Sequence, residues 1–136
     1  MECLPVGSKD LIIVVTSVGT EDQALDVAHA LIRNRQAACV NIVPNVHSIY
    51  RWKGRVCDDT EWLCVIKTVS GQFQAVRETI QKVNTYELPE ILAYRVDDAS
   101  DGFGDWIVRM TERPKKRTSA ARSKTRRPAA VSTIAS

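Results

Sequence analysis

Residues 37–69 read AACVNIVPNVHSIYRWKGRVCDDTEWLCVIKTV, with Val, Ile, Tyr and Trp frequent on both sides of Lys53-Gly54. Such residues are typical of strands, and Lys-Gly between two runs of them indicates a tight hairpin turn. Pro44 lacks an amide hydrogen, so a bulge or an edge position is expected there. The stretch therefore predicts one long β-hairpin, with one arm over 37–52 and the other over 56–69.

The segments on either side of this hairpin add further strands and helices. Leu11 to Ser17 is a β-branched run, typical of a strand buried on both faces. Thr20 and Gln23 fit a capping box, and the apolar stripe after them predicts a helix to about Gln36. Beyond the hairpin we expect a helix with Phe73, Val76, Ile80 and Val83 on one stripe, a strand over 91–96 and a short helix over 101–110. The order βαββαβ is that of a ferredoxin-like α/β (α+β) subunit.

Length and charge divide the chain into three parts. A chain of 136 residues is the size of a single domain. Residues 1–112 carry 11 basic and 16 acidic side chains, a net charge of −5, whereas residues 113–136 carry 8 basic and no acidic ones. We expect a flexible N-terminus (1–10), one folded domain (11–112) and a disordered basic tail (113–136) that is too poor in apolar residues to order itself. No run of about 18 apolar residues and no signal peptide is visible, so we expect a cytoplasmic protein without a membrane span.

The predicted hairpin is too long for the predicted helices to cover. An arm of about 15 residues reaches roughly 50 Å at 3.3 Å per residue. A helix of similar length covers only about 22 Å. The overhanging end carries Ile49, Tyr50, Trp52 and Val56. Uncovered apolar faces and bare edges invite pairing with another chain, so we expect an oligomer.

Four cysteines raise the question of a metal site. Cys57 and Cys64 are seven residues apart on one arm, so their side chains point to opposite faces. If the register set by a two-residue turn continued unbroken, Cys39 would lie opposite Thr68 and Cys64 opposite Val43. No two thiols meet in that register, and Cys3 lies far outside it. Small core residues are therefore the favoured interpretation over a zinc site.

Catalytic signals are also sparse. His29 reads as a surface residue, and His47 either lies on the surface or joins a polar site between subunits near Thr60 and Glu61. The sequence contains no nucleophile–base order, phosphate-binding glycine loop or H-E-x-x-H motif. We therefore expect a protein that is not an enzyme. The basic tail could attract a protein partner or an anionic surface, and its lack of aromatic residues argues against specific nucleic-acid recognition.

Three stretches together resemble the CutA divalent-cation tolerance family. They are Ala37-Ala-Cys-Val-Asn-Ile-Val-Pro44, then Ser48-Ile-Tyr-Arg-Trp-Lys-Gly54 with Glu61 and Ile66-Lys-Thr68, then Tyr86-Glu-Leu-Pro-Glu-Ile91. Trp106 also fits the pattern. The resemblance runs from about Leu11 to Trp106 and leaves the tail outside.

This resemblance implies a homotrimer of ferredoxin-like subunits related to divalent-metal tolerance and copper binding. It implies an interface that includes Tyr50, Trp52 and Trp106. It further implies intersubunit clefts for a metal ion or small polar ligand, lined by Trp52, Glu61, Tyr86, Glu87 and Glu90, with Glu87 and Glu90 as the metal ligands. The family's usual His-Pro is Asn84-Thr85 here, which predicts weak copper binding because imidazole is a preferred Cu(II) ligand. The alternative is a non-catalytic interaction scaffold or PII-like signalling protein, in which these residues hold the trimer together and the trimer or tail recruits a partner.

Overall fold

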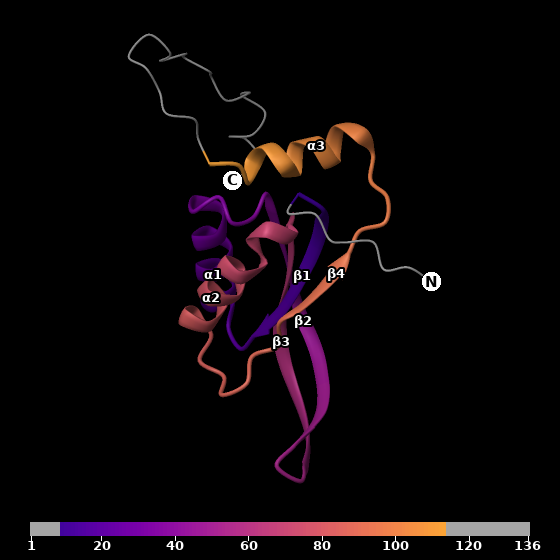
Figure 1. Ribbon diagram of the computed structural model, residues 1–136. Helices are drawn as coiled ribbons and strands as arrows, with labels where there is room; N and C mark the ends of the chain where they lie inside the picture. Colours follow the sequence, from indigo (N-terminus) through magenta and orange to yellow (C-terminus); the bar gives the residue numbers. More distant parts are fainter. Residues whose placement is uncertain (1–8, 114–136) are drawn as a thin grey trace.

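The computed structural model describes residues 9–113, so most of the predicted N-terminal segment and the tail from residue 114 onward lie outside the described residues. The elements follow the predicted βαββαβ order and end in a further helix (Figure 1). They are β1 (Leu11–Val18), α1 (Glu21–Arg33), β2 (Cys39–Trp52), β3 (Arg55–Val69), a 3-10 turn η1 (Ser70–Gln72), α2 (Phe73–Val83), β4 (Leu92–Arg95) and α3 (Asp101–Met110). The predicted α+β fold class is confirmed.

The four strands form one antiparallel sheet in the order β2-β3-β1-β4. The hairpin register is as predicted at its tip, where Trp52 pairs with Arg55 and Arg51 with Val56. Both turn residues have positive φ, 49° at Lys53 and 78° at Gly54. This backbone twist matches that of the strands, which is why a two-residue loop can close the hairpin.

A bulge interrupts the β2–β3 pairing between Val43 and Val46, as Pro44 predicts. Beyond the bulge the register is one residue off the unbroken alignment. Cys39 therefore pairs with Lys67 and Cys64 with Ile42, and the expected partners Thr68 and Val43 were wrong. The extra residue in β2 is the physical reason, since a bulge sets two residues of one strand against one of the other.

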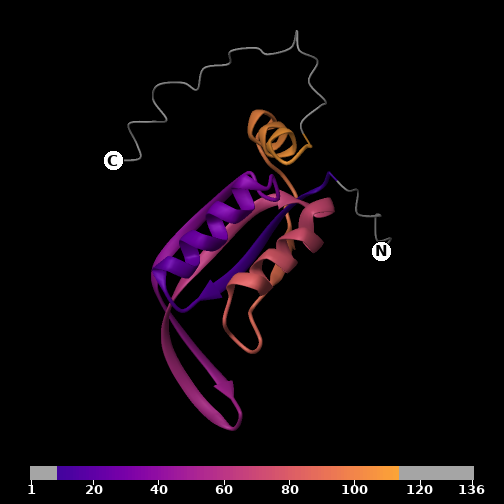
Figure 2. The same cartoon turned by 90° about the vertical axis from the view of Figure 1, so that its left-hand side faces the viewer.

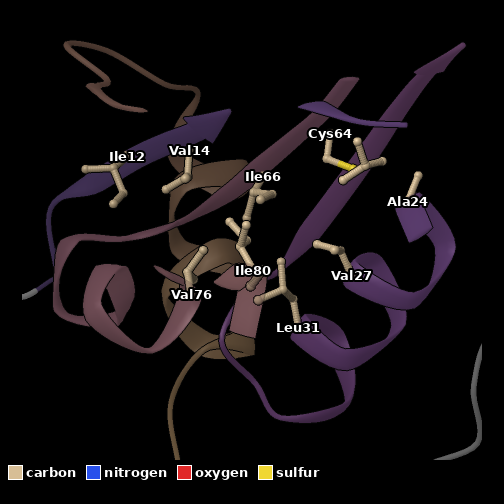
Figure 3. Packing of buried hydrophobic residues seen from close by; sticks show 11 residues of the cluster. Ile12, Val14, Ala24, Val27, Leu31, Cys64, Ile66, Val76 and Ile80 are labelled. Atoms are coloured by element: carbon tan, nitrogen blue, oxygen red, sulfur yellow. The ribbon is translucent and has the colours of Figure 1, made fainter. Parts of the chain in front are cut away.

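Helices α1 and α2 lie side by side on one face of the sheet (Figure 2). Thr20 caps α1 by accepting a bond from the amide of Gln23 at 3.1 Å, as the capping pattern predicts. The helix ends at Arg33, three residues before the predicted end, because Arg35 adopts a positive φ of 56°. The apolar stripes of both helices pack on the sheet to form the core shown in Figure 3: Val14, Val27, Leu31, Ile66, Val76 and Ile80 are fully buried.

The opposite face of the sheet carries apolar side chains that the chain does not cover fully. In β1 every second residue is buried under the helices, but Ile13 and Val15 are only partly buried. The expectation that β1 is buried on both faces is therefore wrong within this chain. Val15 pairs with Val65 and Leu92, so these three share this face, and Leu92 is 52% exposed. We call this surface the open face.

The hairpin extends beyond the helices, as the length comparison predicts (Figure 1). Its arms are 14 and 15 residues long, against 13 and 11 residues for α1 and α2. Ile49 and Val56, near its tip, are 71% and 66% exposed. The loop between α2 and β4 extends toward the part of the hairpin that lies next to the sheet (Figures 1 and 2).

Candidate functional site

A cavity of about 510 Å³ lies between the hairpin, the end of β1 and the loop after α2. Its lining includes all five residues predicted for the cleft: Trp52, Glu61, Tyr86, Glu87 and Glu90. Sequence reasoning missed the rest of the wall as cleft residues, namely Ser17, Ser48, Ile49, Tyr50 and Leu88. A cavity of this volume falls within the usual range for small-molecule sites.

Glu61 is the buried acidic group of this cavity, with only 5% of its surface exposed. It lies on β3 opposite Val46, just beyond the bulge. The Tyr86 hydroxyl donates to Glu61 Oε2 at 2.6 Å. Burial, together with the hydrogen bond and charge of Glu61, raises the pKa of Tyr86 above its ordinary value. Tyr86 therefore stays a neutral donor that holds the carboxylate in place.

Asn84 anchors the loop that carries Tyr86. Its side chain is buried, with Nδ2 donating to the Ser17 carbonyl at 3.1 Å and Oδ1 accepting from the Tyr86 amide at 2.8 Å. The loop is thus tied to the end of β1. Asn84 does not line the cavity. The sequence indicated that a family metal ligand is missing at Asn84; in this chain the asparagine instead holds the loop to β1.

Gly19 leaves the space that the Tyr86 ring needs. A Cβ at this position would lie 3.1 Å from the Tyr86 hydroxyl, closer than an ordinary contact. The sequence indicated no role for Gly19. The steric reason depends on a residue 67 positions later in the chain, so no local pattern could have revealed it.

The rim of the cavity holds a lysine from the hairpin turn. Lys53 Nζ lies 3.3 Å from Glu87 Oε2 and 5.7 Å from the centre of the Trp52 ring. Both partners of the ion pair are 70% exposed, so this contact is accessible to solvent. The sequence predicted Lys53 as a residue of the hairpin turn and gave it no role in the cleft.

Further polar pairs follow the outer part of the hairpin. The Tyr50 hydroxyl donates to Asp59 Oδ2, and this bond with the Asp59 charge raises the pKa of Tyr50 to about 12. His47 pairs with Thr60 across the strands, as expected, and its Nδ1 lies 3.4 Å from Asp58 Oδ1. The histidine is exposed and does not line the cavity. It is therefore not part of this site within one subunit.

The arrangement offers few metal ligands. Within residues 9–113, no group of three or more His, Cys, Asp and Glu side chains is placed to hold a metal ion. Cys39, Cys57 and Cys64 are free thiols, and burial raises the pKa of Cys64 to about 11. Glu87 and Glu90 line the cavity without a nitrogen or sulfur ligand among its lining residues. One subunit therefore does not fit Cu(II), which favours imidazole.

Trp106 is not brought to the cavity. It lies on α3, where its ring stacks on Phe103 with the ring centres 5.5 Å apart. Of the three predicted interface residues, Tyr50 and Trp52 line the cavity wall and Trp106 lies on a separate element.

None of the helices described between residues 9 and 113 is long and apolar enough to cross a membrane.

Comparison with known proteins gives a consistent match. A family model described as CutA1 divalent ion tolerance protein matches residues 12–110. The chain is 39% identical over 95 residues to "Divalent-cation tolerance protein CutA" of Thermus thermophilus, covering 70% of this chain and 92% of that protein. It is 38% identical over 92 residues to "Protein CutA" of Mus musculus, covering 68% of this chain but only 52% of the mouse protein. The solved structure of the divalent cation tolerance protein (Cut A1) from Thermus thermophilus matches with a TM-score of 0.73 and 37% identity, over 75% of this chain and 99% of that one.

Proposed function

The chain belongs to the CutA1 divalent ion tolerance protein family. We propose that it is a homotrimeric, non-catalytic binding protein. Its ligand is a metal ion or small polar molecule held in the cavity beside Glu61. The observation that carries the proposal is this buried carboxylate, which faces a 510 Å³ cavity and is held by Tyr86. A buried acidic group is costly unless it is paired, and one hydrogen bond leaves it able to accept more from a ligand.

The open face supports assembly. An antiparallel sheet that faces water on one side normally shows polar residues there. Here the same face carries Lys67 but also Ile13, Val15, Val65, Leu92 and Tyr94, with Tyr94 53% exposed. Burying one large apolar side chain contributes about 1.5–3 kcal/mol. Several such residues from each subunit make association favourable.

The overhanging hairpin would bring the cavity to a subunit boundary. Ile49 and Trp52 lie on the hairpin and also line the cavity, so a neighbour that covers the hairpin also encloses the cavity. Glu87 and Glu90 then supply oxygen ligands for a weakly held divalent ion, with any further ligands coming from the neighbouring subunit. Asn84 is already engaged in two hydrogen bonds, which supports weak copper binding.

Two measurements on the full chain test the proposal. Light scattering should give three times the 15.2 kDa subunit mass at micromolar concentration. Calorimetric titration with Cu(II), Cu(I), Zn(II) and common nucleotides should then detect binding that Glu61→Gln weakens. A stable monomer would contradict the assembly. A trimer that binds none of these would favour the interaction scaffold instead.

A further inference from the structure

The cavity has an unusual combination of side chains. Among the described residues that line it, three are acidic (Glu61, Glu87 and Glu90) and none is Lys, Arg or His. The aromatic rings of Tyr50, Trp52 and Tyr86 contribute to the same wall. Carboxylates attract any cation, and aromatic faces attract ammonium groups and other organic cations.

The protein already holds such a cation at the rim. The Lys53 ammonium lies 3.3 Å from the Glu87 carboxylate and 5.7 Å from the centre of the Trp52 ring. This side chain is 70% exposed, so it rests on these groups without being enclosed by them. An ammonium on an alkyl stem is thus accommodated by the groups that form the mouth of the cavity.

A bare metal ion fits the same lining less well. Ca²⁺ takes six to eight oxygen ligands, and Mg²⁺ usually keeps several waters in its octahedral shell. Within residues 9–113, no three His, Cys, Asp or Glu side chains are gathered to hold a metal ion. Ile49 and Leu88 contribute apolar surface that a hydrated metal does not use but an alkyl stem does.

We propose that this cavity selects a small organic cation, a primary alkylammonium or similar group, whose charge pairs with Glu61 while its stem packs on the aromatic wall and the rim carboxylates add longer-range attraction. The inference rests on the proposed function of the cavity as a binding site. Lys53 acts in it as a tethered competitor, since its ammonium occupies the rim groups that an incoming cation would use.

Titration of the full chain with n-butylammonium chloride tests this, with 1-butanol as the uncharged counterpart at equal ionic strength. We expect n-butylammonium to bind at least tenfold more tightly than 1-butanol. Lys53→Met should tighten it about two- to tenfold, because a tethered group competes at an effective concentration in the millimolar range. Lys82→Met, at an exposed lysine on α2 that does not line the cavity, is the matched control and should change nothing.

Two variants that each remove one carboxylate test which acidic group binds the ammonium. Glu61→Gln keeps an acceptor for Tyr86 and should weaken n-butylammonium binding at least tenfold. If its melting curve shows misfolding, the exposed Glu90→Gln variant replaces it, with weakening of at least threefold expected. Equal binding of 1-butanol and n-butylammonium would overturn the inference and leave a ligand cavity. Tight Cu(II) binding that Glu61→Gln abolishes and n-butylammonium does not displace would also overturn it. Absence of binding by metals, nucleotides, the amine and the alcohol would remove the proposed function as well.

Discussion

Replacing Asn84 with alanine tests how the loop over the cavity is held. The change removes two hydrogen bonds, to the Ser17 carbonyl at 3.1 Å and from the Tyr86 amide at 2.8 Å. Asn84 is 7% exposed and so is Ser17, so water cannot readily replace the lost partner of that carbonyl. An unsatisfied buried group costs about 1–3 kcal/mol, and a typical bond contributes about 0.5–1.5 kcal/mol. We expect Asn84→Ala to lower the free energy of unfolding by about 2–4 kcal/mol.

Urea denaturation measures this change at one fixed protein concentration, because the stability of the proposed trimer would depend on concentration. Thr85→Ala is the matched control, one residue further along the loop. Thr85 is exposed, and its hydroxyl only accepts a bond from Gln23 Nε2 at 3.1 Å. We expect that control to stay within about 0.5 kcal/mol of the parent, as is usual for surface positions. Asn84→Ala behaving like Thr85→Ala would refute the anchoring role.

Three further changes test the assembly, the loop and the core. Trp52→Ala should weaken the proposed trimer, because a neighbouring subunit would bury Trp52, which is 36% exposed in the single chain, and truncating a buried aromatic residue costs about 3–5 kcal/mol. Light scattering on dilution measures this, and an unchanged dissociation profile would place Trp52 outside the interface. Gly19→Ala should push the Tyr86 hydroxyl away from Glu61 and lower the pKa of Tyr86 toward its ordinary value, as followed by ultraviolet titration. Gly102→Ala, whose Cβ would contact nothing within 4 Å, is the control and should leave that titration unchanged. The folded pKa of Cys64, about 11, is raised by burial above its ordinary value of 9.0, so its stabilising contribution is complete below pH 9 and is lost as pH rises through 11. Cys64→Val should therefore flatten the fall in stability between pH 9 and 11, and an equally steep fall would contradict the burial argument.

Local sequence patterns predicted the strands and helices, because β-branched runs, apolar stripes, a helix cap and a hairpin turn each indicate one kind of element. The Lys53-Gly54 turn fixed the register at the hairpin tip, and Pro44 marked the bulge. The same patterns could not say by how much the bulge shifts the pairing, so the partners of Cys39 and Cys64 were misplaced by one residue. The burial of β1 was also overestimated, because a β-branched run looks the same whether its second face is covered by the chain itself or by another subunit.

The sequence named half of the residues that line the cavity, and it did not show the contacts between them. Family resemblance named Trp52, Glu61 and Tyr86, and the fold brings them to one cavity although 34 positions separate the first from the last. The roles of the residues at this site depend on contacts between segments that are distant in the sequence. Asn84 forms a hydrogen bond to β1, and Lys53 forms an ion pair with Glu87 at the rim of the cavity. A substitution that removes a family imidazole is therefore not simply the loss of a ligand. The asparagine in its place uses both amide atoms to fix Tyr86, and Tyr86 in turn fixes Glu61. The cavity thus keeps its buried carboxylate in position while offering no imidazole, an arrangement better suited to an ammonium group than to copper.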